Sequence, residues 1–307
     1  MKLPLPTQVR VLERGWLSSN NILFLEGERA ALVDSGYVSH APQTLALVRN
    51  ALDGRKLTRL INTHAHSDHI GGNATLQREY GCSITVPHGI AQVIARWDEE
   101  ALMLTPCAQV CDRFNHDATL GVGEEFELGG LVWHALHAPG HDMQALVFYC
   151  ESRRLLISGD ALWRDGFGIQ FAEILNQAAG LAATKATLEA IGRLAVDVVI
   201  PGHGAPFAEF DDALERAFKR VAAFEQEPLR MARNALKACF TFSLLEMRRL
   251  PRARLAKYLQ GVPFFKDIGD RILQFSVEEL AEWLLAELMR AQVVKFDGDD
   301  IVPTQNA

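Results

Sequence analysis

The chain has 307 residues, of which 49% are hydrophobic and 22% are charged, and its formal net charge is −7 at pH 7. This composition is typical of a globular protein with a sizeable core, with room for one large domain or for a domain of about 200 residues beside a smaller one. The net negative charge argues against a general binder of polyanions. No run of about 18 apolar residues is present, so we expect no membrane-spanning helix and no membrane partner.

The N-terminal sequence MKLPLPTQVR lacks the apolar core and the small-residue cleavage site of a secretory signal. The five cysteines are odd in number and irregularly spaced, which favours reduced thiols and a cytoplasmic location. Cys107 and Cys111 lie four residues apart, but no second pair accompanies them. We therefore expect these two residues to be buried or helix-facing thiols, not metal ligands.

The first hundred residues alternate between apolar runs with strand character and segments with helical spacing. The expected elements are, in order, a hairpin of strands at 21–26 and 30–34, a helix at 41–52, a strand at 57–62, a helix at about 73–80, a strand at 83–87 and a helical segment at 88–98. Residues 99–118 show no regular pattern.

Strand patterns return after this irregular stretch, and several of these strands end in a loop that holds glycine or proline together with a histidine or an aspartate. The expected elements are strands at 126–128, 131–137, 145–150 and 155–158, an amphipathic helix at 177–195 and a strand at 196–200.

The composition changes after about residue 210, where strand patterns give way to long helical spacing. Residues 215–258 hold eleven Lys or Arg against four Asp or Glu. Ser276-Val277-Glu278-Glu279 is a capping box that predicts a helix continuing to about Arg290, and the apolar runs around Asp297-Gly298 predict a hairpin. We therefore expect a first domain at residues 1–210 and a mainly helical, winged-helix-like domain at 211–307.

The sequence THAHSDHIGGN at residues 63–73 carries four strong metal ligands: His64, His66, Asp68 and His69. Burying such a cluster is costly unless a cation compensates it, so these residues predict one half of a metal site. The stretch follows a predicted strand, and its Gly-Gly-Asn end is expected to allow a tight turn into the next helix.

Three later segments place a histidine or an aspartate at the end of a predicted strand: His141 in APGHD, Asp160 in ISGDAL and His203 in IPGHGAP. Strand ends in layered proteins of helices and sheets often carry functional residues. The repeated pattern predicts that these segments and THAHSDHIGGN form one shared site.

This ordered set of segments resembles the metallo-β-lactamase superfamily over roughly residues 10–208. The resemblance implies an α+β fold, a four-layer αββα sandwich with a dinuclear metal site at one edge, followed here by the C-terminal mainly helical domain. It implies two ligand sets and one bridging carboxylate: His64, His66 and His141 for one ion, Asp68, His69 and His203 for the other, and Asp160 for both. Asp34 in LVDSG resembles the family's first motif and is expected to support the ligands.

Imidazole and carboxylate ligands suit two divalent ions, zinc in the first place, with iron or manganese as alternatives. Two such cations can hold a hydroxide between them, because metal binding lowers the pKa of water to about 7. They also polarise a carbonyl or phosphoryl oxygen. Asp68 is expected to orient the hydroxide and accept its proton, so Asp68 and Asp160 are the expected catalytic residues.

The leading expectation is a dinuclear hydrolase whose metal-bound hydroxide attacks an ester, thioester or lactone carbonyl of a small molecule. Asp160 argues against antibiotic hydrolysis, because the zinc β-lactamases usually lack this bridging residue. IPGHGAP departs from the GHEYT-like segment of glyoxalase II, and no basic triplet for glutathione is evident. The complete ligand set also disfavours persulfide dioxygenases, which use a single iron with fewer ligands.

Four apolar residues follow Asp160 closely and are candidates either for lining an apolar substrate pocket or for packing in the core: Trp163, Phe167, Ile169 and Phe171. The remaining histidines match no motif position and are expected to be structural or solvated: His40, His88, His116, His134 and His137.

Two other functions stay open. The first is a metal-dependent nuclease that hydrolyses RNA phosphodiesters, with the basic residues of 215–258 contacting phosphates; solvated helix faces explain the same residues. The second is a ligand-binding regulatory protein on the same fold. The apolar residues of the helical tail could pack on the protein's own core or form a homodimer.

Overall fold

The computed structural model describes residue 3 and residues 5–304. The contacts within the chain define two compact units: Met1–Leu102 with Val110–Ala222, and Met103–Gln109 with Ala223–Ala307. A short segment from the middle of the chain therefore belongs with the C-terminal unit. The sequence predicts a boundary after residue 210, where helix α8 (Phe210–Gln226) begins, whereas the contacts change unit within that helix. The functional domain boundary stays a prediction.

The first unit contains a six-stranded sheet in the order β1-β2-β3-β4-β5-β6. The pairs β1–β2 and β2–β3 are antiparallel, and the pairs β3–β4, β4–β5 and β5–β6 are parallel. Their bounds are Val9–Leu12, Asn21–Glu26, Arg29–Val33, Lys56–Ile61, Ser83–Pro87 and Ala118–Leu120. The hairpin predicted from the first apolar runs is confirmed as β2 and β3.

A five-stranded sheet lies in the same unit, in the order β11-β10-β9-β8-β7. Only its β10–β11 pair is parallel. In chain order the strands are β7 (Glu125–Leu128), β8 (Leu131–His137), β9 (Leu146–Cys150), β10 (Leu155–Gly159) and β11 (Val198–Pro201). All five were predicted from the sequence, to within two residues at each end.

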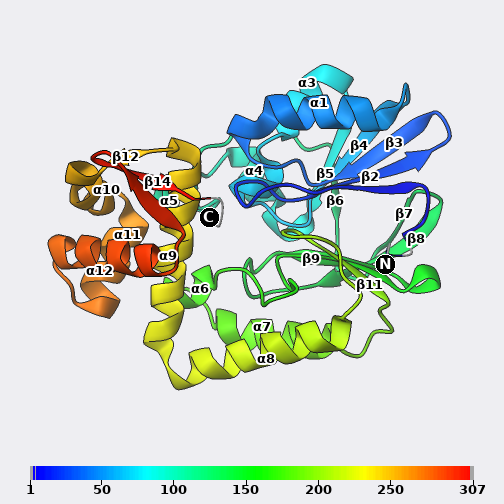
Figure 1. Cartoon of the computed structure of the whole chain (residues 1–307). Coiled ribbons are helices and arrows are strands. Elements are labelled where there is room, and N and C mark those ends of the chain that lie inside the picture. The colour runs from blue at the N-terminus through cyan, green and yellow to red at the C-terminus, as the bar shows by residue number, and fades with distance from the viewer. Residues whose placement is uncertain (1–2, 4, 305–307) are drawn as a thin grey trace. The chain divides into compact units, whose positions relative to one another are not determined.

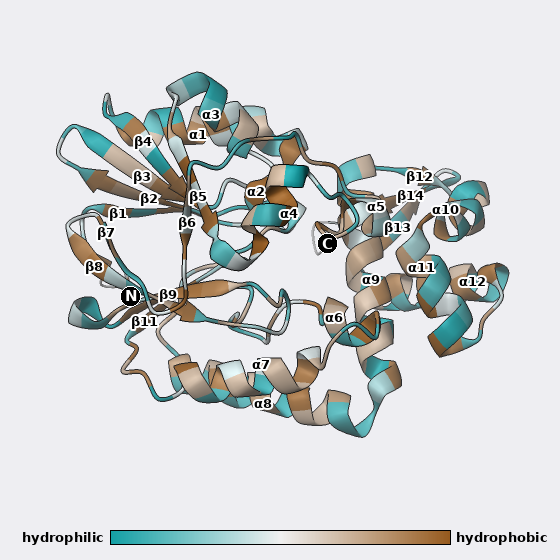
Figure 2. Cartoon of the chain, turned by 180° about the vertical axis from the view of Figure 1, so that it is seen from behind, coloured by the Kyte–Doolittle hydropathy of each residue, from teal (hydrophilic) through white to brown (hydrophobic). Residues whose placement is uncertain are grey.

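The two sheets pack face to face, and helices cover their outer faces (Figure 1). Helices α1 (Ala41–Leu52) and α3 (Asn73–Tyr80) lie on the first sheet, and α7 (Gly180–Ile191) and α8 lie beside the second. Between the sheets the side chains of Phe24, Trp133 and Phe148 are fully buried. Figure 2 shows hydrophobic colour on the paired strands and mixed colour along α7 and α8, as expected for helices with one solvent-facing side. The predicted αββα sandwich is confirmed.

The remaining elements of the first unit are short. They are the α-helices α2 (Ser67–Ile70), α4 (Ala91–Arg96) and α6 (Phe171–Ile174), and the 3-10 turns Val38–His40, His88–Ile90 and Glu151–Arg153. The helix expected at 177–195 is shorter at both ends, because α7 begins at Gly180 and ends at Ile191.

The second unit is mainly helical, as predicted, and also holds a three-stranded sheet in the order β12-β14-β13. The capping box is confirmed, since Ser276 accepts a hydrogen bond from the Glu279 amide and opens the last helix. The helices are α5 (Leu104–Cys107), α9 (Pro228–Met247), α10 (Leu255–Gly261), α11 (Pro263–Asp267) and α12 (Val277–Arg290), with a 3-10 turn at Arg252–Arg254 and a π-helical segment at Ile268–Leu273. The strands are β12 (Leu250–Pro251), β13 (Val294–Asp297) and β14 (Asp300–Pro303). The expected likeness to a winged helix stays a prediction.

Across the described residues, no helix combines the length and the apolar character needed to cross a membrane.

Candidate metal centre

All seven predicted ligands follow the ends of strands in the first unit, and the structure brings them together in two groups. Within each group, the candidate ligand atoms lie within 4.8 Å of one another. One group is His64, His66 and His141, and the other is Asp68, His69, Asp160 and His203. The segments after β4, β8, β10 and β11 supply them.

The loop after β4 is shaped by two glycines that allow a close approach of the backbone. A Cβ atom on Gly71 would lie 2.3 Å from the Val38 nitrogen, and one on Gly72 would lie 2.5 Å from the Ser35 carbonyl oxygen. Both glycines have ordinary right-handed helical backbone angles. The expected tight turn is confirmed, since residues 71 and 72 form a turn that leads directly into α3, and the absence of side chains at both positions also permits this close packing. This packing seats α2, which carries Asp68 and His69.

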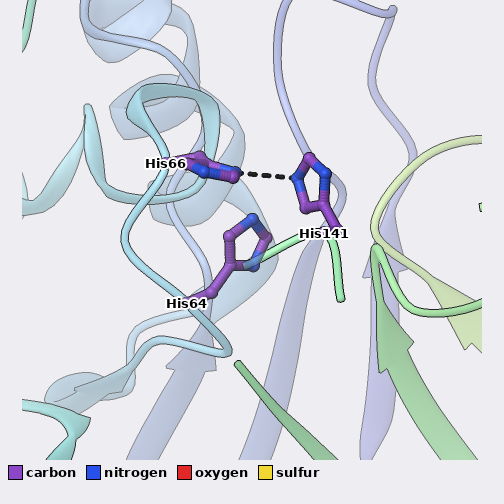
Figure 3. A group of neighbouring side chains, drawn as sticks. All are labelled: His64, His66 and His141. Atoms are coloured by element: carbon purple, nitrogen blue, oxygen red, sulfur yellow. Dashed lines mark hydrogen bonds between the residues drawn. The ribbon is translucent and has the colours of Figure 1, made fainter. Parts of the chain in front are cut away.

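The three histidines of the first group converge with their ring nitrogens (Figure 3). The His66 Nδ1 and His141 Nε2 atoms are 2.7 Å apart. The His64 ring centroid lies 4.8 Å from that of His66 and 5.3 Å from that of His141. The Nε2 atom of His64 is buried and makes no hydrogen bond with any described residue.

In the second group, carboxylate oxygens face imidazole nitrogens. The His203 Nε2 atom is 3.0 Å from Asp68 Oδ2, and the His69 Nε2 atom is 3.4 Å from Asp160 Oδ1. All four side chains are buried. The Nε2 atom of His69, like that of His64, has no hydrogen-bond partner in the described part of the chain.

Asp160 belongs to the second group and also faces the first. Its Oδ2 atom is 3.4 Å from His141 Nε2 in the first group and 3.8 Å from His203 Nε2 in the second. One oxygen of this carboxylate therefore faces both sets of imidazoles, which is the placement that a bridging ligand requires.

In three histidines the Nδ1 atom lies within hydrogen-bonding distance of a neighbouring group. This contact leaves the Nε2 atom of each ring directed at the other candidate ligands. His69 Nδ1 donates to Asp34 Oδ2 at 2.7 Å, and His141 Nδ1 donates to the Ile169 carbonyl oxygen at 2.6 Å. His64 Nδ1 lies 3.1 Å from the Thr63 hydroxyl. Such partners fix the tautomer and the orientation of a metal-binding imidazole. Asp34 itself lies outside both groups.

Burial and neighbouring charges set the protonation of the site. Burial lowers the pKa of His66 and of His141 to about 4, with His66 adding to the effect at His141. Burial and the neighbouring imidazoles lower the pKa of His64 well below its ordinary value. These three rings are therefore neutral at pH 7 and carry the lone pairs that a cation needs.

The second group behaves differently because it contains carboxylates. Burial opposes charge on His69, but the carboxylates of Asp34, Asp160 and Asp68 outweigh it and raise the pKa of His69 well above its ordinary value. Burial also opposes ionisation of Asp160, yet His203 and His69 hold the pKa of Asp160 well below its usual range. The carboxylate is therefore ionised at neutral pH.

The donor set fits two divalent cations. Imidazole nitrogens and carboxylate oxygens are the ligands that zinc, iron and manganese accept. The Nε2 atoms of His64 and His69 are buried without a hydrogen bond to any described residue, which is costly unless something binds them. The absence of a side chain at Gly202 lets the backbone approach Asp160 closely, since a Cβ atom there would lie 2.2 Å from Asp160 Oδ1.

Aromatic side chains surround both groups. Trp16 stacks on His203 with ring centroids 5.3 Å apart, and Trp163 meets the same ring edge-on at 5.4 Å. Phe171 lies 5.3 Å from His66 and 5.7 Å from His141.

Of the four apolar residues singled out after Asp160, Trp163 and Phe171 touch the candidate ligands, whereas Phe167 is buried with 1% exposure. Ile169 contributes its carbonyl oxygen to His141. Trp16 was missed by the sequence reasoning, because it lies in an irregular loop and belongs to no recognised motif.

The other residues considered from the sequence are not part of the two groups. Among the described residues, His134 lies 3.4 Å from Glu125, and the His137 Nε2 atom is 3.2 Å from the Met143 carbonyl oxygen. Cys107 is buried and Cys111 is partly buried, both as free thiols. These side chains have local structural contacts.

Two packed sheets, outer helices and a donor set at the strand ends define an αββα protein with a candidate two-metal centre. The family model of the metallo-beta-lactamase superfamily matches residues 14–203. The chain therefore belongs to the metallo-beta-lactamase superfamily.

Several curated relatives are similar to part of the chain. A hydroxyacylglutathione hydrolase from Nitrobacter winogradskyi is 30% identical over 133 residues, which is 43% of this chain and 44% of the relative. One from Methylococcus capsulatus is 32% identical over 132 residues, which is 42% of this chain and 44% of the relative. The chain thus matches less than half the length of these relatives.

Solved structures show the same fold. A metallo-beta-lactamase from Cronobacter sakazakii with a HARLDQ motif has a TM-score of 0.59 at 19% identity, covering 75% of this chain and 99% of that one. A metallo-beta-lactamase family protein from Thermus thermophilus has a TM-score of 0.56 at 19% identity, covering 97% of this chain and 99% of that one.

Proposed function

We propose that the protein is a metal-dependent hydrolase that cleaves small-molecule thioesters, with esters and lactones as related carbonyl substrates. The observation that carries this proposal is the Asp160 carboxylate, whose Oδ2 atom faces His141 and His203 of two otherwise separate donor groups. The thioester class is supported by the relatives named hydroxyacylglutathione hydrolase.

In this proposal, each donor group binds one divalent ion, zinc in the first place, with iron or manganese as alternatives. When bound, the two ions would supply a water of lowered pKa and polarisation of the substrate carbonyl oxygen. His64, His66 and His141 hold the first ion, Asp68, His69 and His203 hold the second, and Asp160 is shared. His69 and His141 are kept in position by Asp34 and by the Ile169 carbonyl oxygen.

Asp68 is the residue that we assign to proton transfer. Its carboxylate is held 3.0 Å from His203 Nε2, and its pKa is lowered because His69 and His203 outweigh the effect of burial. An ionised carboxylate at this position can orient the attacking water and accept its proton. Trp163 and Phe171 provide an apolar wall beside the ligands, which would exclude water and contact the acyl group.

The last motif bears on which thiol the substrate carries. IPGHGAP differs from the GHEYT-like segment of glyoxalase II, and no basic triplet for glutathione is evident from the sequence. We therefore propose thioester hydrolysis without assigning glutathione as the thiol carrier, and the substrate panel below compares carriers directly.

The experiment compares metal-free protein with protein reloaded with zinc, manganese or iron(II), using thioesters of several thiols, a lactone and an activated phosphodiester. We expect thioester turnover that is lost on chelation and restored by metal. His64→Asn should lower turnover by at least the 10–100-fold typical of losing an outer-shell partner, because it removes a ligand outright. His137→Asn is the matched control outside both groups. Absence of turnover of every carbonyl substrate by the metal-loaded protein would overturn the proposal.

The phosphodiester arm tests the nuclease alternative, which no particular contact favours. Several basic residues of the tail are already paired with carboxylates inside the protein. Arg249 lies 3.1 Å from Asp297 and 3.0 Å from Asp300, and Lys237 lies 3.5 Å from Glu287. Such paired cations are less available to phosphates than unpaired ones.

A further inference from the structure

We propose that Trp163 is a positioning residue for the carboxylate shared by the two donor groups. Its indole Nε1–H donates a hydrogen bond to Asp160 Oδ1 at 3.1 Å. The other oxygen, Oδ2, then faces His141 and His203. This inference rests on the two-metal site of the proposed function, and it adds a residue outside the ligand set on which that site depends.

A carboxylate can rotate about its Cα–Cβ and Cβ–Cγ bonds, so its orientation must be fixed by contacts. Oδ1 of Asp160 lies between the Trp163 indole and the backbone of Gly202, where an added Cβ would come within 2.2 Å. The main chain of Asp160 is held as well, because the Gly168 amide donates to the main-chain carbonyl oxygen of Asp160 at 2.9 Å. Oδ1 also lies 3.4 Å from His69 Nε2, while Oδ2 faces an imidazole of each group, so fixing Oδ1 would keep Oδ2 in the place from which Asp160 could be shared by two ions.

Trp163 is itself held in a tight turn. Its amide donates to the Gly166 carbonyl oxygen at 2.7 Å, and the two residues form an isolated antiparallel bridge. Gly166 has φ +134°, and a Cβ atom there would lie 2.5 Å from Arg220 Nη1. The turn at 163–166 therefore depends on glycine, and its backbone bridge sets the position from which the indole reaches Asp160.

Helix α8 holds this turn from outside. Arg216 Nε donates to the Arg164 carbonyl oxygen at 2.8 Å and lies 3.3 Å from Asp165 Oδ1. The Arg220 guanidinium sits 5.3 Å above the Phe167 ring. Each of these partly exposed contacts is weak alone. Together they connect α8, through the turn, to the orientation of Asp160.

The test measures metal affinity directly, by competition with a chelator, and records the ligand-field absorption of Co(II) bound in place of the native ion. Trp163→Phe keeps an apolar ring and removes the N–H donor. We expect it to weaken metal binding by about 10–100-fold, the usual effect of losing an outer-shell partner, and to shift the Co(II) absorption.

Two variants on α8 form a matched pair. Arg216→Ala should weaken binding in the same direction by a smaller factor, because it loosens the turn that carries Trp163. Lys219→Ala is the control, since Lys219 is exposed on the same helix and pairs with Glu215. It should leave the affinity and the Co(II) absorption unchanged.

The outcomes separate the two proposals. Unchanged metal affinity and unchanged Co(II) absorption in Trp163→Phe would overturn the role of Trp163, whether or not the protein hydrolyses thioesters. If Trp163→Phe fails to fold, as judged by circular dichroism, Arg216→Ala decides, and an affinity equal to that of Lys219→Ala overturns the proposal. Normal metal binding by the unmodified protein without thioester turnover would count against the proposed function alone.

Discussion

His69 is oriented by the side of its ring that faces away from the candidate centre. Its Nδ1–H donates to Asp34 Oδ2, while the Thr63 amide and hydroxyl donate to Asp34 at 2.9 Å and 2.8 Å. The Asn62 side-chain amide also donates to Asp34 Oδ1 at 3.5 Å, so the Asp34 carboxylate is held by several donors and in turn orients one imidazole. A charged acceptor at Nδ1 also makes Nε2 a stronger base toward a cation.

We predict that Asp34→Asn lowers metal affinity by about 10–100-fold, because the neutral amide is a weaker acceptor for His69 and brings an N–H₂ group to a place built for an acceptor. Chelator competition measures the effect. Asp53→Asn, an exposed carboxylate that pairs with Arg55, should bind metal as the parent does. An Asp34→Asn variant with parental affinity would show that the orientation of His69 does not depend on this carboxylate.

At the scale of elements, the ends of β10 and β11 meet where Asp160 and His203 begin. The Gly202 amide donates to the Gly159 carbonyl oxygen at 2.8 Å, which continues the parallel pairing one step beyond the strands. The approach is so close that a Cβ atom on Gly202 would lie 2.9 Å from the His69 ring as well as 2.2 Å from Asp160 Oδ1.

Gly202→Ala should therefore destabilise the fold by about 1–3 kcal/mol, the usual cost of overpacking, and should displace Asp160 or His69 enough to weaken metal binding. Urea unfolding of the metal-free protein measures the loss of stability, and chelator competition measures the loss of metal affinity. Gly15→Ala is the comparison, because nothing lies within 4 Å of a Cβ added at Gly15. Equal effects of the two substitutions would contradict this account of the strand ends.

The sequence predicts this part of the molecule well where apolar residues follow a strand or helix period. Strands β2, β3 and β5 and helices α1 and α3 have this property, and their positions agree with the structure. Helix α5 does not, since it is a single turn between Met103 and Ala108, which both have positive φ. A segment so short carries no period to detect.

The candidate site also contains some residues that a sequence pattern reveals and others that no pattern reveals. Its seven candidate ligands could be proposed because histidine and aspartate at strand ends form an ordered set of motifs, and the structure gathers all seven side chains in two groups. The contacts of Trp16 and the donor role of Trp163 could not be found in this way. The stacking of Trp16 on His203 depends on how two loops distant in the sequence meet, and the bond from Trp163 to Asp160 depends on the conformation of the loop that carries both residues; neither is marked by a sequence pattern.

At the scale of the whole molecule, the C-terminal unit takes α5 from the middle of the chain. Leu104 and Cys107 of α5 are buried, with 3% and 6% exposure, and α5 packs against α11 in the same unit. Burial and the neighbouring Cys107 thiol raise the pKa of Cys239 on α9 well above its ordinary value, which disfavours the thiolate form.

Truncation after Ala222 removes α11 and the other C-terminal helices, and should therefore expose the apolar side chains of α5 to solvent. We expect the truncated chain to be poorly soluble and to bind a hydrophobic dye strongly, whereas the full chain does not. Adding Leu104→Ser and Cys107→Ser to the same truncation should reduce dye binding. A soluble truncated chain with dye binding as low as that of the full chain would contradict the assignment of α5 to the second unit.

Residues 103–109 belong to the second unit although the first unit surrounds them in the sequence, and this affects how the two units can be exchanged by recombination. In a protein whose domains follow one another, a single genetic crossover can exchange the C-terminal domain and keep each core whole. Here one crossover near residue 222 would bring in a new tail but leave the old α5 behind, so the incoming core would meet a foreign segment. The two units are thus linked in inheritance, because the contact between α5 and α11 joins segments that lie more than a hundred residues apart in the chain.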